Sequence, residues 1–249
     1  MKKILFVGES WVIHSTHIKG FDQFESSTYE EGGKWVIEAL EAAGYEVRYL
    51  RGHEAPNGFP YSMEELRQYD AVFFSDIGAN SFLLSDDVFV RGQIRVNRLD
   101  LVRDYVADGG AFCMIGGYLS FSGIQARAQY GRTAINDILP VEIMLTDDRV
   151  EGCQGFRPEI TDSTHELVRD LPAEWPPFLG YNQAVLRPDC EAAATINGDP
   201  FIAARDYGKG RTAVFMSDCS PHWATMQFVE WKHYNQVWKN IADYITKTI

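Results

Sequence analysis

The first half of the chain alternates short apolar runs with segments whose apolar residues recur at helical spacing. Four apolar runs are predicted to be strands: Ile4 to Val7, Glu46 to Leu50, Tyr69 to Asp76 and Ala111 to Ile115. Between them, Glu31 to Ala43 and Asn97 to Ala107 have the period of helices that bury one face. Continuous apolar strands separated by helices indicate a parallel sheet with helices on both faces.

The second half has shorter strands and ends in a long amphipathic segment. The strands are predicted at Phe156 to Ile160, Gln183 to Leu186, Ala192 to Ile196, Ile202 to Asp206 and Thr212 to Ser217. Gly208-Lys209-Gly210 separates the last two and is typical of a hairpin turn. Apolar residues from Phe228 to Ile245 share one stripe, which predicts a C-terminal helix packed on the sheet. Because no linker or repeat interrupts residues 1–249, we expect a single α/β domain.

Polar residues follow the strands at four places. They are Glu9-Ser10-Trp11, Ser75-Asp76, Tyr118-Leu119-Ser120 and Ser217-Asp218. Ligands of such sheets bind at the carboxyl ends of the strands, so these groups are expected to converge on one site.

Composition narrows the choice of ligand. With 23 Lys and Arg against 35 Asp and Glu, the net charge is -12, which argues against a nucleic acid or an anionic membrane as partner. The N-terminal apolar run is interrupted at Glu9, and no apolar stretch is long enough to span a bilayer. The four cysteines show no zinc or disulfide spacing, which predicts a cytoplasmic protein. No phosphate-binding glycine motif occurs, so no cofactor is expected.

The segment Gly116-Gly117-Tyr118-Leu119-Ser120 has the form of a nucleophile elbow, a sharp turn between strand and helix. Such a turn lifts one side chain above the sheet and aims backbone N–H groups at a reacting oxygen. Glycine spacing places Tyr118 at the apex, and a shift of one residue would place Gly117 or Leu119 there.

Together with this turn, two other segments carry a resemblance to a known family. Tyr69 to Gly78 and Ser217-Asp218-Cys219-Ser220-Pro221-His222-Trp223 resemble a branch of the class I glutamine amidotransferase-like proteins. The chain is also similar, more distantly, to the ThuA-like group. The resemblance implies a flavodoxin-like, doubly wound, mostly parallel sheet with the site at the strand ends.

Family members that hydrolyse glutamine use a Cys–His–Glu triad, and His222 falls at the histidine position. Tyr118 stands where the cysteine would be, and Ala224 stands where the glutamate would be. A phenol is a poor nucleophile at neutral pH. We therefore expect the family fold without glutaminase activity.

Other residues offer alternatives. Cys113 is expected to be a buried core residue, and Cys219, three residues before His222, is a weak candidate nucleophile. His14 and His17 are spaced to share a helical face and are weak candidates for a metal site with a nearby carboxylate. The aromatic residues near the strand ends would form either a stacking floor for a sugar or ordinary core: Trp11, Tyr118, Phe121 and Trp223.

Three functions follow as hypotheses. The first is binding or transformation of a small polar molecule, with Tyr118 and His222 as an acid/base pair. Its ligand contacts are predicted to be Glu9, Ser10, Trp11, Asp76, Gly117, Ser120, Asp218 and Trp223. The second is a sugar-directed hydrolase or isomerase, with or without a metal. The third is a non-enzymatic interaction protein, and for all three a homo-oligomer is expected by analogy with similar folds.

Overall fold

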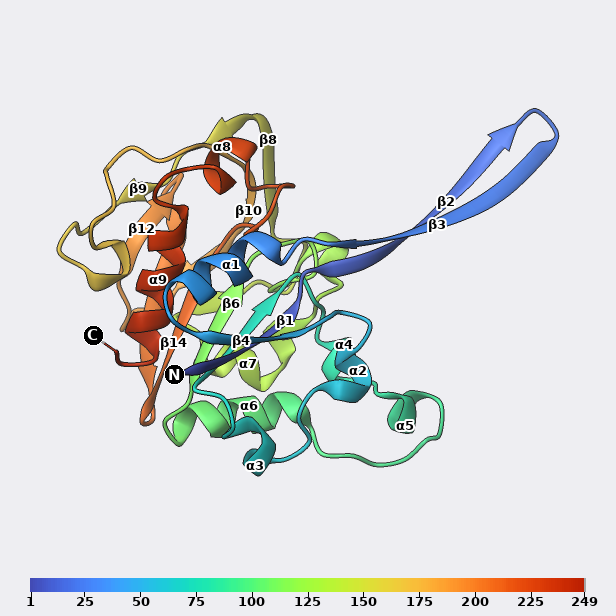
Figure 1. Cartoon of the computed structure of the whole chain (residues 1–249), viewed down its shortest axis with the longest axis horizontal. Coiled ribbons are helices and arrows are strands. Elements are labelled where there is room, and N and C mark those ends of the chain that lie inside the picture. The colour runs from blue at the N-terminus through green and yellow to red at the C-terminus, as the bar shows by residue number, and fades with distance from the viewer. Residues whose placement is uncertain (249) are drawn as a thin grey trace.

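The computed structural model describes residues 1–248, and its centre is an eight-stranded sheet (Figure 1). Across the sheet the strands follow the order β4 (Glu46–Leu50), β1 (Lys3–Gly8), β5 (Ala71–Ser75), β6 (Ala111–Ile115), β14 (Gly210–Phe215), β13 (Asp199–Tyr207), β12 (Ala192–Ile196) and β9 (Glu159–Ile160). The strands from β4 to β14 are parallel, and the remaining three are antiparallel to their neighbours. The α/β fold with a mostly parallel sheet is confirmed.

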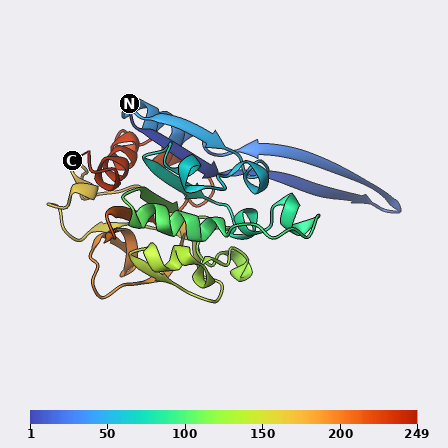
Figure 2. The same ribbon diagram turned by 90° about the horizontal axis from the view of Figure 1, so that it is seen from below.

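Helices cover both faces of this sheet, as expected (Figure 2). One face carries α1 (Lys34–Ala42) packed against α9 (Tyr234–Ile245), and the other carries α6 (Arg98–Ala107) packed against α7 (Ala134–Ile138). The remaining helices are short: α2 (Ala55–Gly58), α3 (Met63–Leu66), α4 (Asn80–Leu83), α5 (Asp86–Phe89) and α8 (Met226–Val229). Short 3-10 helices span Ile124–Ala126, Tyr130–Arg132 and Glu166–Val168. No helix within residues 1–248 has the length and apolar character needed to cross a lipid bilayer.

The predicted helix boundaries are partly right. Asn97 caps α6, since its side-chain oxygen accepts the Leu99 N–H at 3.0 Å. The helix predicted from Glu31 begins at Lys34 instead, because Glu31 is the last residue of a strand. The C-terminal stripe from Phe228 is interrupted and forms α8 and α9 rather than one helix.

The largest difference from the sequence-based expectation lies between residues 10 and 31. There β2 (Ser10–Lys19) and β3 (Asp22–Glu31) form a two-stranded hairpin that projects from the body of the molecule (Figure 1). Gly20 supplies the positive φ of 66° that the turn requires. Residues of high β-propensity, such as Val12 and Ile13, favour the strands. His14 and His17 therefore lie on a strand, and the helical face expected for them is wrong.

Two small antiparallel sheets accompany the central sheet. One pairs β8 (Arg149–Phe156) with β10 (Phe178–Asn182), and the other pairs β7 (Val141–Ile143) with β11 (Ala184–Leu186). The strand predicted from Phe156 to Ile160 is divided between β8 and β9, with Pro158 in the gap, because proline cannot donate to a ladder. The hairpin predicted at Gly208-Lys209-Gly210 joins β13 to β14 and is confirmed.

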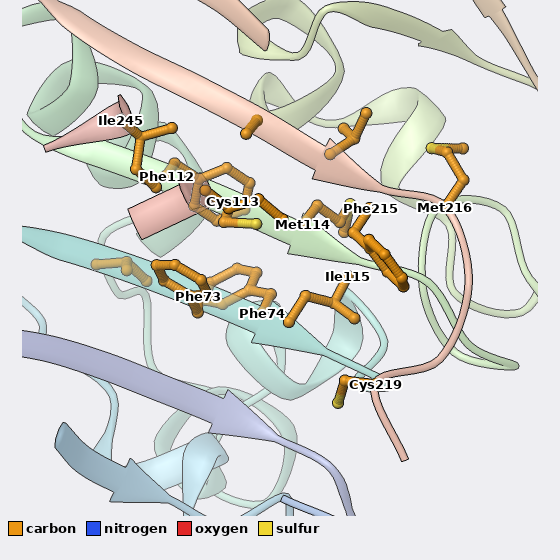
Figure 3. Packing of buried hydrophobic residues seen from close by; sticks show 14 of the residues in the cluster. Phe73, Phe74, Phe112, Cys113, Met114, Ile115, Phe215, Met216, Cys219 and Ile245 are labelled. Atoms are coloured by element: carbon orange, nitrogen blue, oxygen red, sulfur yellow. The ribbon is translucent and has the colours of Figure 1, made fainter. Parts of the chain in front are cut away.

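The core is continuous through the middle of the central sheet (Figure 3). Phe73, Phe112 and Phe215, from three adjacent strands, are fully buried. Cys113 is also fully buried among them, so its expected place in the core is confirmed. This packed interior fixes where the strands end, and the polar residues that follow them form the candidate site.

Candidate active site

The carboxyl ends of the parallel strands meet at one pocket. Glu9 directly follows β1, Asp76 directly follows β5, and Asp218 lies three residues after the end of β14. With neighbouring loops they enclose a cavity of about 270 Å³, lined by Glu9, Trp11, Asp76, Tyr118, Asp218, Ser220, Pro221 and His222. That volume suits a small molecule. The convergence of strand ends inferred from the sequence therefore gathers three carboxyl groups and one imidazole.

Two of these carboxyl groups are held on unusual backbone. Glu9 has a φ of 50° and Asp76 a φ of 43°, in the left-handed region that residues other than glycine rarely adopt. The Glu9 N–H donates to Ser75 O at 2.8 Å, and the Asp76 N–H donates to Ser120 Oγ at 3.1 Å. These hydrogen bonds hold both residues in their strained conformations. Strained backbone of this kind is common at functional sites.

Glu9 forms the floor of the pocket. It is 2% exposed and accepts hydrogen bonds from Ser75 Oγ at 2.5 Å and from Ser220 Oγ at 2.6 Å. Burial raises the pKa of Glu9, and the nearby charge of Asp218 raises it further, against the lowering effect of the serine hydroxyls. Glu9 therefore holds its proton more tightly than a surface glutamate does.

Asp76 and Asp218 are affected by the same physics. Burial raises the pKa of Asp76 to about 6, and the charge of Glu9 adds to the shift. Burial likewise raises the pKa of Asp218 to about 6, and Asp76 adds to the shift, while His222 opposes it. Like charges that share a low-dielectric site resist simultaneous ionisation. The three carboxyl groups at the base of the pocket therefore keep their protons to a higher pH than surface carboxyl groups do.

His222 is held at the pocket edge by Asp218. Its Nδ1 lies 2.7 Å from Asp218 Oδ2, which also accepts the Trp223 N–H at 2.8 Å. The His222 side chain is 46% exposed, whereas that of Asp218 is 4% exposed. The hydrogen bond to Asp218 raises the pKa of His222, outweighing the effect of partial burial. A buried carboxylate that fixes one ring nitrogen leaves the other available for proton transfer.

Tyr118 lines the pocket, but its hydroxyl is already engaged. The phenol donates to Glu151 Oε1 at 2.8 Å, and Trp223 Nε1 donates to the same oxygen at 2.9 Å. The Tyr118 ring meets the His222 ring edge-on, with centroids 4.4 Å apart. Burial raises the pKa of Tyr118, and Glu151 raises it further. Tyr118 therefore contributes its ring to the pocket wall and supports the orientation of His222.

The turn after β6 differs in detail from a nucleophile elbow centred on Tyr118. Positive φ falls at Gly117, with a value of 146°, which is the alternative register that the glycine spacing left open. The Gly117 N–H donates to Asn182 Oδ1 at 2.9 Å, and the Leu119 N–H donates to Asp76 Oδ1 at 2.6 Å. With Tyr118 at the apex, the Leu119 N–H would be the oxyanion donor that follows the nucleophile, and Asp76 already occupies it.

The remaining predicted contacts stand behind the pocket wall. Ser10 Oγ accepts the Gly52 N–H at 2.8 Å and fixes the base of the hairpin. Ser120 is 1% exposed and donates to Ile115 O at 2.6 Å. Trp223 is 2% exposed. Glu151 and Asn182 were missed in the sequence because they lie on β8 and β10, far along the chain from any motif.

Neither buried cysteine is placed as a nucleophile. Cys219 is fully buried (Figure 3). Its sulfur lies 3.5 Å from Ser75 Oγ. Burial raises the pKa of the Cys219 thiol well above its usual value, and the charge of Glu9 raises it further. The thiolate that nucleophilic attack requires is therefore suppressed.

The histidines of the hairpin do not join the pocket. His14 Nδ1 lies 2.7 Å from Ser27 Oγ, and His17 Nε2 lies 3.1 Å from Ser26 Oγ. Three positions apart on one strand, their side chains point to opposite faces of the hairpin. Across residues 1–248, no three His, Cys, Asp or Glu side chains are grouped as ligands of a metal ion.

Comparison with known proteins identifies a family that this chain matches. Residues 3–247 match the protein family described as "Putative glutamine amidotransferase". Cytoplasmic protein STM3548 of Salmonella typhimurium is 46% identical, with a TM-score of 0.94 over 97% of this chain and 98% of its own. Cytoplasmic protein STM1381 of Salmonella typhimurium LT2 is 45% identical, with a TM-score of 0.94 over 98% of this chain and 99% of its own.

A more distant likeness extends to the fold alone. A protein of Bacteroides uniformis ATCC 8492, described as a "Putative thua-like protein", has a TM-score of 0.56 at 11% identity, over 98% of this chain and 91% of its own. Among curated proteins, none shows significant similarity to this sequence.

Proposed function

The chain belongs to the glutamine amidotransferase-like family, and we propose that it carries out acid–base chemistry on a small polar molecule without the cysteine nucleophile of glutamine hydrolysis. The observation that carries the proposal is the pair formed by His222 and the buried Asp218, 2.7 Å apart at the edge of the cavity. The cytoplasmic relatives support a cytoplasmic location for this chain as well.

The proposed mechanism assigns the base to His222. Asp218 accepts a hydrogen bond from the Nδ1–H of His222, which fixes the ring and stabilises the imidazolium that forms when Nε2 takes a proton. Glu9 and Asp76 line the same cavity and hold protons at higher pH than surface carboxyl groups do. They are suited to donate a proton to, or accept a hydrogen bond from, the opposite end of the substrate.

Glutamine hydrolysis is disfavoured by three features of the site. The residue at positive φ is Gly117, which has no side chain to attack with. The N–H of Leu119 is taken by Asp76, and the thiol of Cys219 is buried. Together these remove the nucleophile and reduce stabilisation of the oxyanion.

A sugar-like substrate is the second, more specific candidate. Trp11 and Tyr118 line the cavity beside the carboxyl groups of Glu9 and Asp76. Aromatic faces pack against the apolar side of a sugar ring, while carboxylates accept hydrogen bonds from hydroxyl groups. This combination favours a neutral polyhydroxylated ligand over an anionic one, because an anion would meet three carboxyl groups.

The test is a ligand screen read by thermal shift and calorimetry. Neutral monosaccharides and disaccharides, hydroxy acids and glutamine are offered to wild type, His222→Ala and Asp218→Asn, with His233→Ala as the matched histidine control. We expect a neutral sugar to bind wild type and His233→Ala, and to bind the two site variants roughly 10 to 100 times more weakly.

Two further readouts separate the candidates. Conversion of the bound sugar, followed by NMR at saturating sugar, should be lost in His222→Ala and retained in His233→Ala. Ammonia released from glutamine by wild type but not by His222→Ala would overturn the proposal. If hydroxy acids bind and sugars do not, the sugar-directed version is wrong. The acid–base proposal then remains, with a hydroxy acid as the substrate.

A further inference from the structure

The hairpin from Ser10 to Glu31, called the arm from here on, is attached to the body only at its base. Its strands β2 and β3 each have ten residues and pair with each other in a sheet of two strands. Every residue of β3 is exposed, as are most residues of β2. At the base, Arg51 Nε donates to Glu31 at 2.5 Å, and Tyr49 Oη donates to Glu9 O at 3.0 Å.

A projecting two-stranded arm with exposed apolar side chains is unfavourable in an isolated chain in water. A two-stranded hairpin is at best marginally stable alone, because neither face is packed on a core. Yet the outer part of the arm exposes Ile18 by 71%, Phe21 fully and Phe24 by 50%. Its tip therefore carries apolar surface that folding of the single chain leaves uncovered.

A second apolar surface lies on the same side of the molecule. The segment from residue 84 to residue 96, called the α5 loop, exposes Phe89 by 76%, Val90 by 73% and Ile94 by 99%. In both views the arm and the α5 loop extend away from the body in the same direction (Figures 1 and 2). The two segments thus project from the same side of the body.

The charges of the arm are segregated between its strands. Strand β2 carries Lys19 with His14 and His17, and it has no acidic residue. Strand β3 has four acidic residues and no basic one: Asp22, Glu25, Glu30 and Glu31. Because Lys19 is the one formally cationic residue of the two strands, the arm is mainly acidic and poorly suited to an anionic partner such as a nucleic acid. Its apolar tip needs an apolar partner surface, and the α5 loop of a second copy offers one.

We propose that the arm and the α5 loop form the interface with a second copy of this chain. The two ten-residue strands of the arm and the α5 loop together contain more than the roughly 20 to 30 residues that each side of a stable interface needs. Burial against a second copy covers the apolar tip and supplies the packed face that the isolated hairpin lacks. Trp11, at the base of the arm, lines the cavity, so the interface adjoins the candidate active site.

The experiment measures mass in solution by analytical ultracentrifugation over a range of protein concentrations. Wild type is expected at twice the chain mass of 28.2 kDa. Phe21→Glu and Ile94→Glu change side chains that are fully exposed in the single chain, so each should fold normally. Each should weaken the dimer by about 100-fold, because association would bury the new charge.

Val185→Glu is the matched control, since Val185 is 62% exposed and lies outside both surfaces, on β11. It should remain dimeric. A second variant shortens the arm by replacing residues 15–26 with Asn-Gly, and it should be monomeric with an unchanged circular dichroism spectrum of the body. The proposal is overturned if wild type has the mass of one chain at about 100 µM, or if the shortened variant dimerises as wild type does. These readouts are independent of ligand binding and of activity.

Discussion

A side chain at Gly117 would collide with the carboxylate of Asp76, since an ideal Cβ at Gly117 lies 2.8 Å from Asp76 Oδ1. The same Cβ would lie 2.9 Å from Asp218 Oδ1. The carboxylates of Asp76 and Asp218 therefore occupy the space that a side chain on residue 117 would need. Both this packing and the positive φ of 146° favour glycine at the turn.

Replacing Gly117 with cysteine should consequently fail to create a glutaminase. We expect Gly117→Cys to release no ammonia from glutamine and to destabilise the protein by roughly 2 to 4 kcal/mol, from positive φ and steric overlap together. Chemical denaturation measures the loss. Gly198→Cys isolates the backbone contribution, because Gly198 has a φ of 84° and nothing within 4 Å of its Cβ position. It should cost only about 1 kcal/mol, and equal losses in the two variants would contradict the steric argument.

The pair of Asp218 and His222 predicts a change in histidine titration. Because the hydrogen bond to Asp218 raises the pKa of His222, Asp218→Asn should lower it. NMR titration of the imidazole Hε1 signals measures the shift directly. The pKa of His165, which burial lowers, should be the same in both proteins. An unchanged His222 titration would show that Asp218 does not govern the imidazole, and the proposed base would lose its support.

Asp76 predicts how stability depends on pH. Its pKa is 3.8 in the reference state and about 6 when folded, so the folded chain binds the proton more tightly. The corresponding stability is complete below pH 3.8 and is lost as the pH rises through about 6. Asp76→Asn keeps an oxygen acceptor for the Leu119 N–H and removes the charge.

The variant should therefore be more stable than wild type by about 1 to 3 kcal/mol near pH 7, with a smaller difference near pH 4. Urea unfolding at several pH values measures this. Asp86→Asn changes an exposed aspartate and should follow the wild-type pH dependence. A wild type that gains stability relative to Asp76→Asn between pH 4 and pH 7 would reverse the sign and exclude a raised Asp76 pKa.

The cysteines predict a pattern of chemical reactivity. Cys153 is exposed, Cys190 is partly exposed, and Cys113 and Cys219 are fully buried. A thiol reagent should label Cys153 first and Cys190 more slowly. The two buried thiols should react roughly a thousand times more slowly, through local or global opening.

Mass spectrometry of the labelled protein identifies the sites, and guanidinium-unfolded protein provides the reference in which all four react. Cys219→Ser should retain the ligand binding of wild type. Rapid native labelling of Cys219 that also abolishes binding would mean that this thiol reaches the pocket.

Much of the central sheet follows from local sequence. The apolar run from Ala111 to Ile115 could only be a strand buried on both faces, and β6 has those bounds. The turn at Gly208-Lys209-Gly210 likewise required no tertiary information. The arm was missed because its strands have no core to pack on, so the alternation of buried and exposed positions that reveals a half-buried strand is absent.

The site was only partly accessible from the sequence. Glu9, Asp76 and Asp218 follow strands and were found by that rule, as was His222 through its motif. Glu151 and Asn182 were not, because a hydrogen-bond partner supplied by another small sheet leaves no local pattern. The sequence also left the register of the turn open among Gly117, Tyr118 and Leu119, since the φ of a residue depends on the packing around it.

By itself, the sequence determined the strands and helices of the parallel part of the sheet and the family fold. These depend on residue type and spacing, which are local. Only the tertiary structure decided that Asp218 orients His222, that three carboxyl groups share one buried floor, and that the arm stands free of the body. Those relationships depend on distances between segments far apart in the chain, and on the low dielectric that their packing creates.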